Sequence, residues 1–424
     1  MDDDLTFDGP DAPEGDAFFD PPEDLSGGAV GDAIYLRPLD NPEAELTHGR
    51  NWLVLYRSNS VDGEVIAVSG IIALPHDRPT DPAGYPLVTW AHGTVGVCHL
   101  CAPSRDTVDR GAHLMNKYPQ PLLNHFLDQG WAVAMTDYEG LGVTGRRHPY
   151  LLGRSEAYGV LDIVETTRRL FPEVISPKFA IVGHSQGGQA ALFSAHHAKD
   201  RVEGLVGVAA VAPANHPKAI VRAGALVPTF GDGGFAFTPL FLSGAIIGDT
   251  TIGVDNVLSN KARGVWPDVL SMCRADLSKD ESWGGVRGIE QFRKTLPGAQ
   301  PAYSFPGNPN DDQQRFVDQL ELMNPNVEID VPIRISQSAD DVRVKAETTE
   351  VDLLGIKIII PGVDVLANEE LVATNTDNKP LYVRYPKGDV QIPNPDPGDL
   401  GAHFATLTHD RDDLTGWVGD RFRD

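Results

Sequence analysis

The 424-residue chain has few cysteines, and this shortage narrows what it can build. Its three cysteines, Cys98, Cys101 and Cys273, cannot all pair within one chain. Cys98 and Cys101 have no second Cys or His pair at the spacing of zinc ligands, which argues against a metal site. The sequence leaves two alternatives open: one disulfide from Cys98 or Cys101 to Cys273, or free thiols.

Long hydrophobic runs are also missing. No apolar stretch reaches the roughly 18 residues that a membrane span needs. The first residues, "MDDDLTFDGPDAPEGDAFFD", have neither the basic region nor the apolar region of a signal peptide. The sequence therefore predicts a cytoplasmic protein, or the mature chain of a secreted one whose leader was removed. It does not indicate an oligomeric state.

Basic residues are scarce. The 60 acidic and 35 basic residues give a net charge of -25, and Asp supplies 42 of the acids while Lys supplies only 11 of the bases. Such a surface repels nucleic acid and anionic membranes, so nucleic acid is excluded as a partner. An Asp-rich, Lys-poor surface suggests halotolerance as a hypothesis, beside the alternative of an ordinary acidic protein. A stability that stays flat or falls from low to molar salt would count against it.

Short apolar runs alternate with longer helical stretches over most of the chain. This pattern is typical of an α/β fold with a mostly parallel sheet. Helical spacing of apolar residues predicts a helix over 155–171, with Ser155 as its N-cap. Residues 51–60 and 64–74 predict an antiparallel hairpin. The runs that predict buried parallel strands are 85–93, 130–140, 178–188, 204–214, 331–341 and 380–389.

Composition divides the chain into four parts. Residues 1–30 are acidic and rich in Pro and Gly, which predicts an N-terminal arm that is extended on the surface or partly disordered. The α/β core would occupy 31–213 and 326–424. Between them, 214–325 lacks the strand–helix alternation and is too long for a bare loop, so we expect an inserted helical subdomain there.

The stretch "GHSQG" contains a candidate catalytic residue. Ser185 lies between Gly183 and Gly187, after an apolar β-run and before a predicted helix. This strand–turn–helix context is that of a nucleophile elbow, and the glycines relieve crowding at the sharp turn. The alternative is a glycine-rich turn without chemistry. We expect Ser185 to be a nucleophile.

A serine nucleophile needs a base, and an acid to orient that base. In elbow folds the chain order is Ser, acid, His, which leaves His403 and His409 as candidates for the base. His403 follows a loop after the last predicted strand, whereas His409 resembles a helix cap, so His403 is favoured. Asp340 and Asp341 both follow the predicted strand 331–336, and the residues alone do not separate them.

An oxyanion would need two backbone donors. The N–H of Gln186, directly after the nucleophile, should be one. The N–H of Thr94, in the loop after the strand that ends at Ala91, should be the other, because Gly93 permits an unusual backbone turn there. His92 precedes the serine in the chain and is interpreted as structural.

The segments "WAHGTVGVCHLCAPS", "TDYEGLGVTGRRHPYLLGRSEAYGVLD" and "GHSQGGQAALFSA" together resemble the secretory lipase family of α/β-hydrolases, which includes fungal lipase A and actinobacterial lipases. The resemblance covers nearly the whole chain. It implies the α/β-hydrolase fold, Ser185 as nucleophile, and a cap over the acyl site in 214–325. The family's segment before its acid is similar to Gln337–Val344, which implies Asp341 rather than Asp340.

The same resemblance supports His403, which lies 14 residues before Trp417 of the terminal "WVGDRF". One departure is the stretch 351–375, which is longer and more β-like than the helix that the family implies. Asp137 and Glu139 of "DYEGLG" are interpreted as shaping a turn or bonding backbone amides, and Arg154 and Glu156 as candidates for structural ion pairs.

These residues predict a serine carboxylester hydrolase, a lipase or esterase, that needs no cofactor and no metal. Its substrate would be a small-molecule or lipid ester, with transient contact between the cap and a lipid interface. Alternatives are an acyltransferase with the same triad and a non-catalytic binding module, which a fluorophosphonate would leave unlabelled. The natural ester and its acyl chain length are not indicated.

Overall fold

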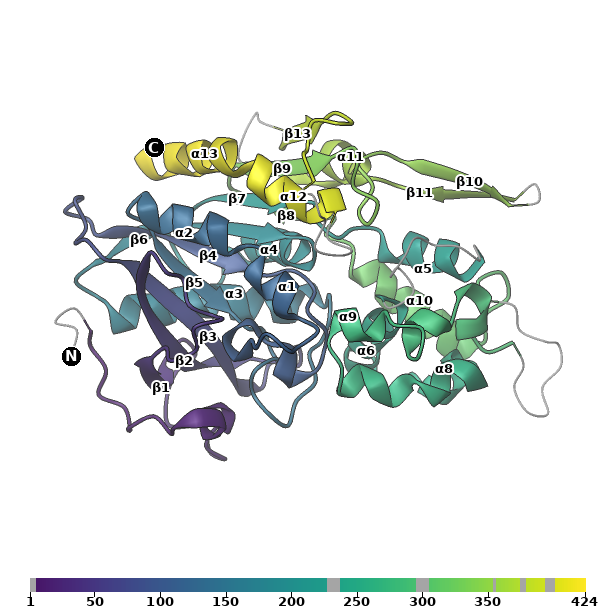
Figure 1. Cartoon of the computed structure of the whole chain (residues 1–424), viewed down its shortest axis with the longest axis horizontal. Coiled ribbons are helices and arrows are strands. Elements are labelled where there is room, and N and C mark those ends of the chain that lie inside the picture. The colour runs from purple at the N-terminus through teal and green to yellow at the C-terminus, as the bar shows by residue number, and fades with distance from the viewer. Residues whose placement is uncertain (1–4, 227–236, 295–304, 354–355, 374–378, 393–400) are drawn as a thin grey trace.

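A nine-stranded sheet forms the centre of the molecule (Figure 1). The computed structural model describes residues 5–226, 237–294, 305–353, 356–373, 379–392 and 401–424. Parts of the predicted arm (1–4), of the predicted insertion (227–236 and 295–304) and of the loop before His403 (393–400) lie outside these residues. Among the described helices, none combines the length and the apolar character that crossing a membrane requires.

The sheet has an antiparallel end and a parallel centre. The predicted hairpin is formed by β2 (Gly49–Asn59) and β3 (Val65–Pro75), with β1 (Ala33–Pro38) at the edge. The six strands expected to be parallel are all present and parallel to one another, in the order β5-β4-β6-β7-β9-β13. Their bounds are β4 Tyr85–Ala91, β5 Ala132–Thr136, β6 Ile175–His184, β7 Leu205–Val211, β9 Ile333–Ser338 and β13 Leu381–Tyr385.

The central strands are apolar on both faces, which explains their nearly continuous hydrophobic runs. Along β6, Phe179 and Ile181 point into one core cluster, while Ala180 and Val182 point into another. The prediction of a buried strand over 380–389 is wrong in one respect. β13 is the edge strand, and Leu381 is 48% exposed, because no further strand or helix covers its outer side among the described residues.

Helices cover both faces of the sheet (Figure 1). The helix expected over 155–171 begins two residues earlier, at Gly153, with Leu152 as its N-cap. The Ser155 hydroxyl is therefore not a cap and donates to Glu139 instead. The helices are α3 Gly153–Leu170 and α4 Gln186–Ala198 on one face, and α2 Gln120–Asp128, α12 Gly401–His409 and α13 Arg411–Arg423 on the other.

Short helices lie between β7 and β9 in the chain and form a group beside the sheet (Figure 1). They have a separate hydrophobic cluster that includes Leu240, Phe241, Trp283 and Phe316. The domain bounds 214–325 stay a prediction. The helices are α5 Pro217–Leu226, α6 Phe237–Gly248, α7 Val254–Val257, α8 Asn260–Gly264, α9 Arg274–Leu277 and α10 Asp311–Leu322, with 3-10 turns at Trp266–Leu270, Trp283–Gly285 and Gly288–Gln291.

The remaining elements join and extend these layers. β10 (Thr349–Leu353) and β11 (Ile356–Ile360) form a hairpin that extends away from the sheet, so the β-like stretch noted in the sequence does contain strands (Figure 1). Phe18 and Phe19 anchor the N-terminal arm in a small cluster with Ile34. The other elements are α1 His113–Lys117, α11 Val363–Val365, the π-helical turn η8 Leu366–Glu370, the paired strands β8 Glu328–Ile329 and β12 Val372–Ala373, and 3-10 turns at Gly15–Phe19, His99–Cys101 and Pro103–Arg105.

Candidate active site

Ser185 is placed on the turn between β6 and α4. It has φ 58° and ψ -118°, a strained backbone conformation for a residue other than glycine. A Cβ on Gly187 would lie 1.8 Å from the Ala91 carbonyl oxygen, so only glycine allows β4 and α4 to approach so closely. Ser185 is half-buried, whereas the residues on both sides of it are buried. The turn thus exposes one hydroxyl at the carboxyl end of the sheet.

Asp341 and His403 are joined by a hydrogen bond of 2.7 Å between Oδ2 and Nδ1. The other carboxylate oxygen of Asp341 accepts from the N–H groups of Arg343 at 2.9 Å and Val344 at 3.0 Å. Burial opposes the charged form of Asp341, but the charge and hydrogen bond of His403 outweigh it and lower the pKa of the carboxyl. Because ionised Asp341 can only accept, His403 carries its hydrogen on Nδ1 and presents Nε2 as a base.

The two alternative residues lie elsewhere. Asp340 accepts a hydrogen bond from the N–H of Gly388 at 2.6 Å, and no bond joins it to either histidine. His409 is exposed at the end of α12, where its ring contacts Tyr385. The structure therefore brings Asp341 to His403, as the resemblance implied, and not Asp340 to His409.

His184 connects the nucleophile turn to the start of α12. Its Nε2–H donates to the His403 carbonyl oxygen at 3.0 Å, and the two rings lie 4.6 Å apart. Burial lowers the pKa of His184 well below its ordinary value, so this neighbour of Ser185 stays neutral. No described residue forms a hydrogen bond with the Ser185 hydroxyl, and contacts between a nucleophile and its base are often loose before substrate binds.

The two expected oxyanion donors flank Ser185. Gln186 is the first residue of α4, so its N–H has no acceptor within the helix. A Cβ on Gly93 would lie 3.6 Å from the Ser185 Cβ, which places the loop that carries Thr94 against the nucleophile. The N–H of Thr94 donates to no other described residue. His92 is buried, and burial lowers its pKa to about 4, in keeping with a structural role.

Buried polar groups behind α4 were missed by sequence reasoning. Of the two ion-pair candidates, Glu156 lies 3.5 Å from Nε2 of His148, whereas Arg154 Nε donates to the Tyr158 hydroxyl. Glu156 is fully buried and accepts from the side-chain amide of Gln186 at 2.6 Å. The same amide lies 2.7 Å from Nε2 of His148. The sequence contains both Gln186 and Glu156, but no sequence pattern predicts that their side chains form a hydrogen bond.

The residues of the "DYEGLG" segment have the structural role predicted for them. Asp137 accepts from the hydroxyls of Ser69 and Ser104. Glu139 accepts from the Ser155 hydroxyl at 2.6 Å. Burial raises the pKa of both carboxyls, and each of these bonds partly offsets that shift.

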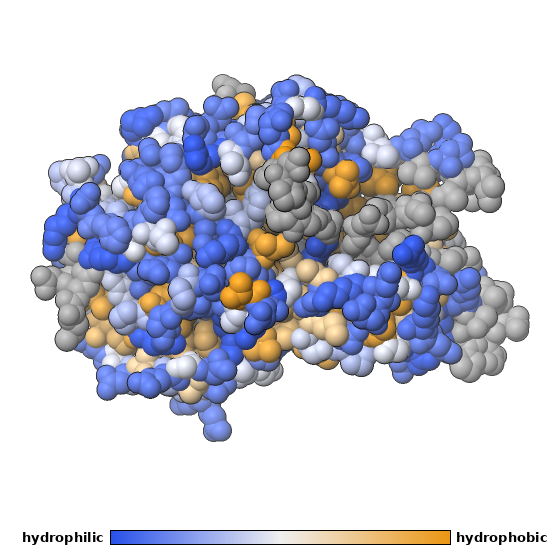
Figure 2. Space-filling model, in the orientation of Figure 1, coloured by the Kyte–Doolittle hydropathy of each residue, from blue (hydrophilic) through white to orange (hydrophobic). Residues whose placement is uncertain are grey.

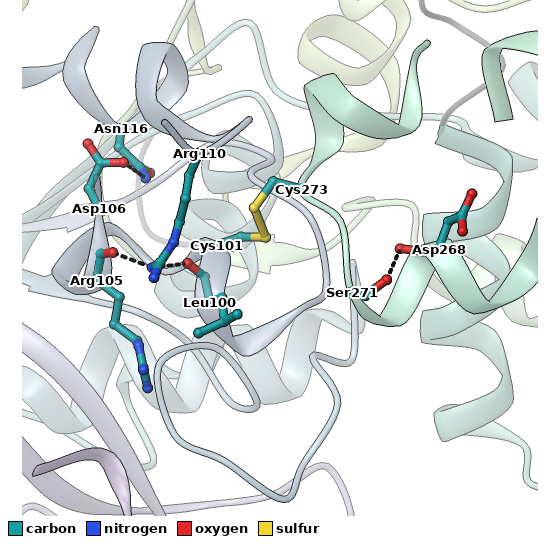
Figure 3. Close-up of a disulfide and its surroundings, with 9 residues drawn as sticks. All are labelled: Leu100, Cys101, Arg105, Asp106, Arg110, Asn116, Asp268, Ser271 and Cys273. Atoms are coloured by element: carbon teal, nitrogen blue, oxygen red, sulfur yellow. Dashed lines mark hydrogen bonds between the residues drawn. A yellow bond between two sulfur atoms is a disulfide. The ribbon is translucent and has the colours of Figure 1, made fainter. Parts of the chain in front are cut away.

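A disulfide ties the loop beyond Thr94 to the helices between β7 and β9 (Figure 3). It joins Cys101 to Cys273, and Cys98 is a buried free thiol. A backbone bond from the N–H of Arg274 to the Val95 carbonyl, at 2.8 Å, lies next to it. The sequence had left the pairing open. The link is buried and fixes Cys273 near the loop that carries Thr94.

Comparisons with known proteins agree with this fold. Residues 111–266 match the family described as alpha/beta hydrolase fold. Lipase 7 of Candida albicans is 26% identical over 192 residues, which cover 42% of this chain and 42% of that lipase. The chain thus aligns with less than half the length of this curated relative.

Solved structures give a longer match. A ligand-bound form of the rice cell wall degrading esterase LipA from Xanthomonas oryzae superposes with a TM-score of 0.65 at 17% identity, covering 93% of this chain and 100% of that one. Candida antarctica lipase A in its closed state superposes with a TM-score of 0.60 at 16% identity, covering 77% of this chain and 74% of that one. This chain has the α/β-hydrolase fold. The relatives named here are lipases and esterases, which agrees with the resemblance inferred from its sequence.

Proposed function

We propose that this protein is a serine carboxylester hydrolase with Ser185, His403 and Asp341 as its triad. The observation that carries the proposal is the buried bond between Asp341 and His403, fixed through His184 to the turn that bears Ser185. The similarity to lipases and esterases supports the class of reaction. The resemblance in sequence supports the same three residues.

The reaction would proceed through an acyl-enzyme. His403 Nε2 takes the hydroxyl proton as Ser185 Oγ bonds to the ester carbonyl carbon, and the N–H groups of Thr94 and Gln186 bind the oxyanion. The carbon–oxygen bond to the alcohol then breaks, and His403 gives its proton to the departing oxygen. Water repeats the sequence on the acyl-serine and releases the carboxylic acid. Apart from the ester and water, each step uses only side chains and backbone groups of this chain.

Replacing the nucleophile tests the proposal. Ser185→Ala should lower kcat on p-nitrophenyl butyrate by about 10⁴–10⁶ and abolish labelling by a fluorophosphonate. Ser194→Ala is a matched control, because Ser194 lies on the same helix and its hydroxyl bonds to the Ala190 carbonyl. Wild-type turnover in Ser185→Ala would refute the assignment of the nucleophile.

The acyl chain length separates a lipase from an esterase. The apolar helix α6, Phe237–Gly248, is one candidate for a lid that moves at a lipid interface. We propose to measure turnover of esters from two to eighteen carbons, below and above the solubility limit of each. An increase in rate only above that limit supports a lipase, whereas saturation below it supports an esterase.

A further inference from the structure

Two buried hydroxyls lie beside the proposed oxyanion site. Thr94 Oγ1 and the Tyr150 hydroxyl are 2.8 Å apart, and the two residues are 7% and 2% exposed. Tyr150 lies on the segment that leads into α3. Its neighbours contact α4: His148 lies against the Gln186 amide, and the Leu151 carbonyl accepts from Gln189 at 3.0 Å. The pair thus sits between the end of β4 and the first turn of α4.

The hydrogen bonds of this pair do not balance. Each hydroxyl brings one hydrogen, and only one of the two can lie between the oxygens. Neither oxygen bonds to any other described residue. Burial raises the pKa of Tyr150, so the phenol keeps its hydrogen. One buried O–H is therefore left without an acceptor, an arrangement that typically costs about 1–3 kcal/mol.

A second pair of the same kind provides an internal comparison. The Tyr56 hydroxyl lies 2.7 Å from Thr136 Oγ1 and donates to the Gly159 carbonyl at 2.9 Å. Thr136 can then donate to Tyr56, and its oxygen accepts from the N–H of Tyr138 at 3.0 Å. Both hydrogens have acceptors there. Of these two Tyr–Thr pairs, only Thr94 and Tyr150 have a hydroxyl hydrogen without an acceptor.

The 2.8 Å contact allows either hydroxyl to donate. We assign the donor role to Tyr150, because a phenol is the more acidic of the two hydroxyls and hence the stronger donor, and the unused hydrogen is then that of Thr94. A hydroxyl that accepts a hydrogen bond becomes a better donor itself, because the two bonds polarise each other. Thr94 therefore keeps a free, strengthened O–H on the same residue whose N–H is proposed to bind the oxyanion.

We infer that the Thr94 hydroxyl is a third donor to the oxyanion, and that Tyr150 is the positioning residue that directs it there. This inference rests on the proposed function, since it requires an oxyanion at Ser185. It also explains why an uncompensated donor is kept in a buried place. The donor gains its acceptor only when the carbonyl oxygen becomes negative, and binding of that kind lowers the barrier rather than KM.

Four variants test the inference on p-nitrophenyl butyrate. Thr94→Val removes the hydroxyl at nearly constant shape and should lower kcat roughly 10- to 100-fold with little change in KM. Thr94→Ser keeps a hydroxyl and should lose much less. Tyr150→Phe should lower kcat about 3- to 10-fold, since it only frees the Thr94 hydroxyl to turn away. Tyr56→Phe, which breaks the balanced pair, is the control for a purely structural loss.

A double-mutant cycle and an inhibitor complete the test. Tyr150→Phe should change kcat little further in a Thr94→Val background, because its effect passes through the missing hydroxyl. An alkyl trifluoromethyl ketone, which forms an oxyanion with serine, should bind more weakly to Thr94→Val and Tyr150→Phe than to Tyr56→Phe. If Thr94→Val does not fold, the affinities of Tyr150→Phe and Thr94→Ser for this inhibitor test the inference.

The outcomes separate the two proposals. The inference is wrong if folded Thr94→Val matches Tyr56→Phe in kcat and inhibitor affinity. It is also wrong if the losses of Thr94→Val and Tyr150→Phe simply add and follow their melting temperatures. In either case the proposed function survives as long as Ser185→Ala is inactive. Turnover in Ser185→Ala would instead remove the proposed function itself.

Discussion

Asp341 and Ser185, two residues of the proposed triad, are each held in one conformation by their surroundings. Asp341 accepts hydrogen bonds from His403, Gln337 and two backbone N–H groups, so its carboxylate is held in one orientation. Ser185 is held in a strained backbone conformation that neighbouring glycines make sterically feasible. The strained backbone of Ser185 costs folding free energy, as is typical of reactive sites, whereas the hydrogen bonds to ionised Asp341 stabilise the fold.

Asp341→Asn tests the role of the acid. An amide in its place no longer stabilises the imidazolium and can leave the wrong nitrogen of His403 protonated, so we expect kcat to fall by about 10³–10⁴ with the fold intact. Asp340→Asn is the matched control, since that side chain only accepts from Gly388. Equal activity of the two variants would contradict the assignment.

The same variant has a defined pH dependence of stability. The pKa of Asp341 is lowered from 3.8 in the folded protein, so its ionised form stabilises the fold above pH 3.8. That stabilisation is lost as pH falls through the lower, folded pKa. The difference in melting temperature between the wild type and Asp341→Asn should therefore be largest above about pH 4 and shrink in stronger acid. A difference that grows with acid would contradict it.

At the residue scale, the sequence indicates candidate catalytic residues more readily than the hydrogen bonds around them. The predictions of Ser185 and His403 rest on a local motif and on chain order. Asp341 and Asp340 are adjacent and of one type, so only the resemblance separated them. Tyr150 could not be found, because its bond to Thr94 joins residues 56 positions apart through the packing of two loops.

Secondary-structure elements were easier to predict where both faces of a strand are buried. The six parallel strands were predicted from apolar runs, since strands packed on both faces carry mostly apolar residues. The prediction that β13 is buried was wrong, because an edge strand can carry the same β-forming residues without being covered. The N-cap at Ser155 was wrong because Glu139, distant in sequence, accepts its hydroxyl hydrogen.

One carboxylate connects elements at both ends of the predicted insertion. Glu370, at the end of η8, lies 2.9 Å from His216 Nε2 and accepts from the Asn324 amide at 2.9 Å. Asn324 in turn accepts from the His216 N–H at 2.9 Å. His216 lies just before α5, and Asn324 lies just after α10. Both residues line a cavity of about 450 Å³.

Glu370→Gln should loosen this connection. The substitution removes the charge and one acceptor, so we expect a loss of about 1–2 kcal/mol in the free energy of unfolding. The control is Glu369→Gln, because Glu369 is exposed beside it. Denaturant unfolding of both variants measures the difference, and equal stabilities would show that Glu370 does not hold the insertion.

The surface charge is a property of the whole molecule. The face in Figure 2 is mostly hydrophilic, in keeping with a net charge of -25. Charge of one sign over a whole surface favours solubility and opposes binding to nucleic acid, but it does not determine the fold. Salt tolerance stays a prediction that a melting curve from low to molar salt would test.

The disulfide is the covalent link between the sheet and the helices beside it. Cys101 and Cys273 are 172 residues apart in sequence. Closing so long a loop restricts the unfolded chain, which by chain entropy stabilises the fold by up to about 5 kcal/mol. The loop contains β5, β6 and β7 and most of the neighbouring helices, so reduction would free much of the molecule at once.

Removing the link should therefore lower stability without touching the proposed chemistry directly. We expect Cys101→Ser/Cys273→Ser to melt several degrees lower than the wild type. A reductant present during unfolding should lower the melting temperature of the wild type but not that of this double variant. Cys98→Ala, at a buried free thiol, should keep this response to reductant. If the wild type melts at the same temperature with and without reductant, the disulfide does not hold the two parts together. If the double variant loses turnover while it remains folded, the link also positions the loop that carries Thr94.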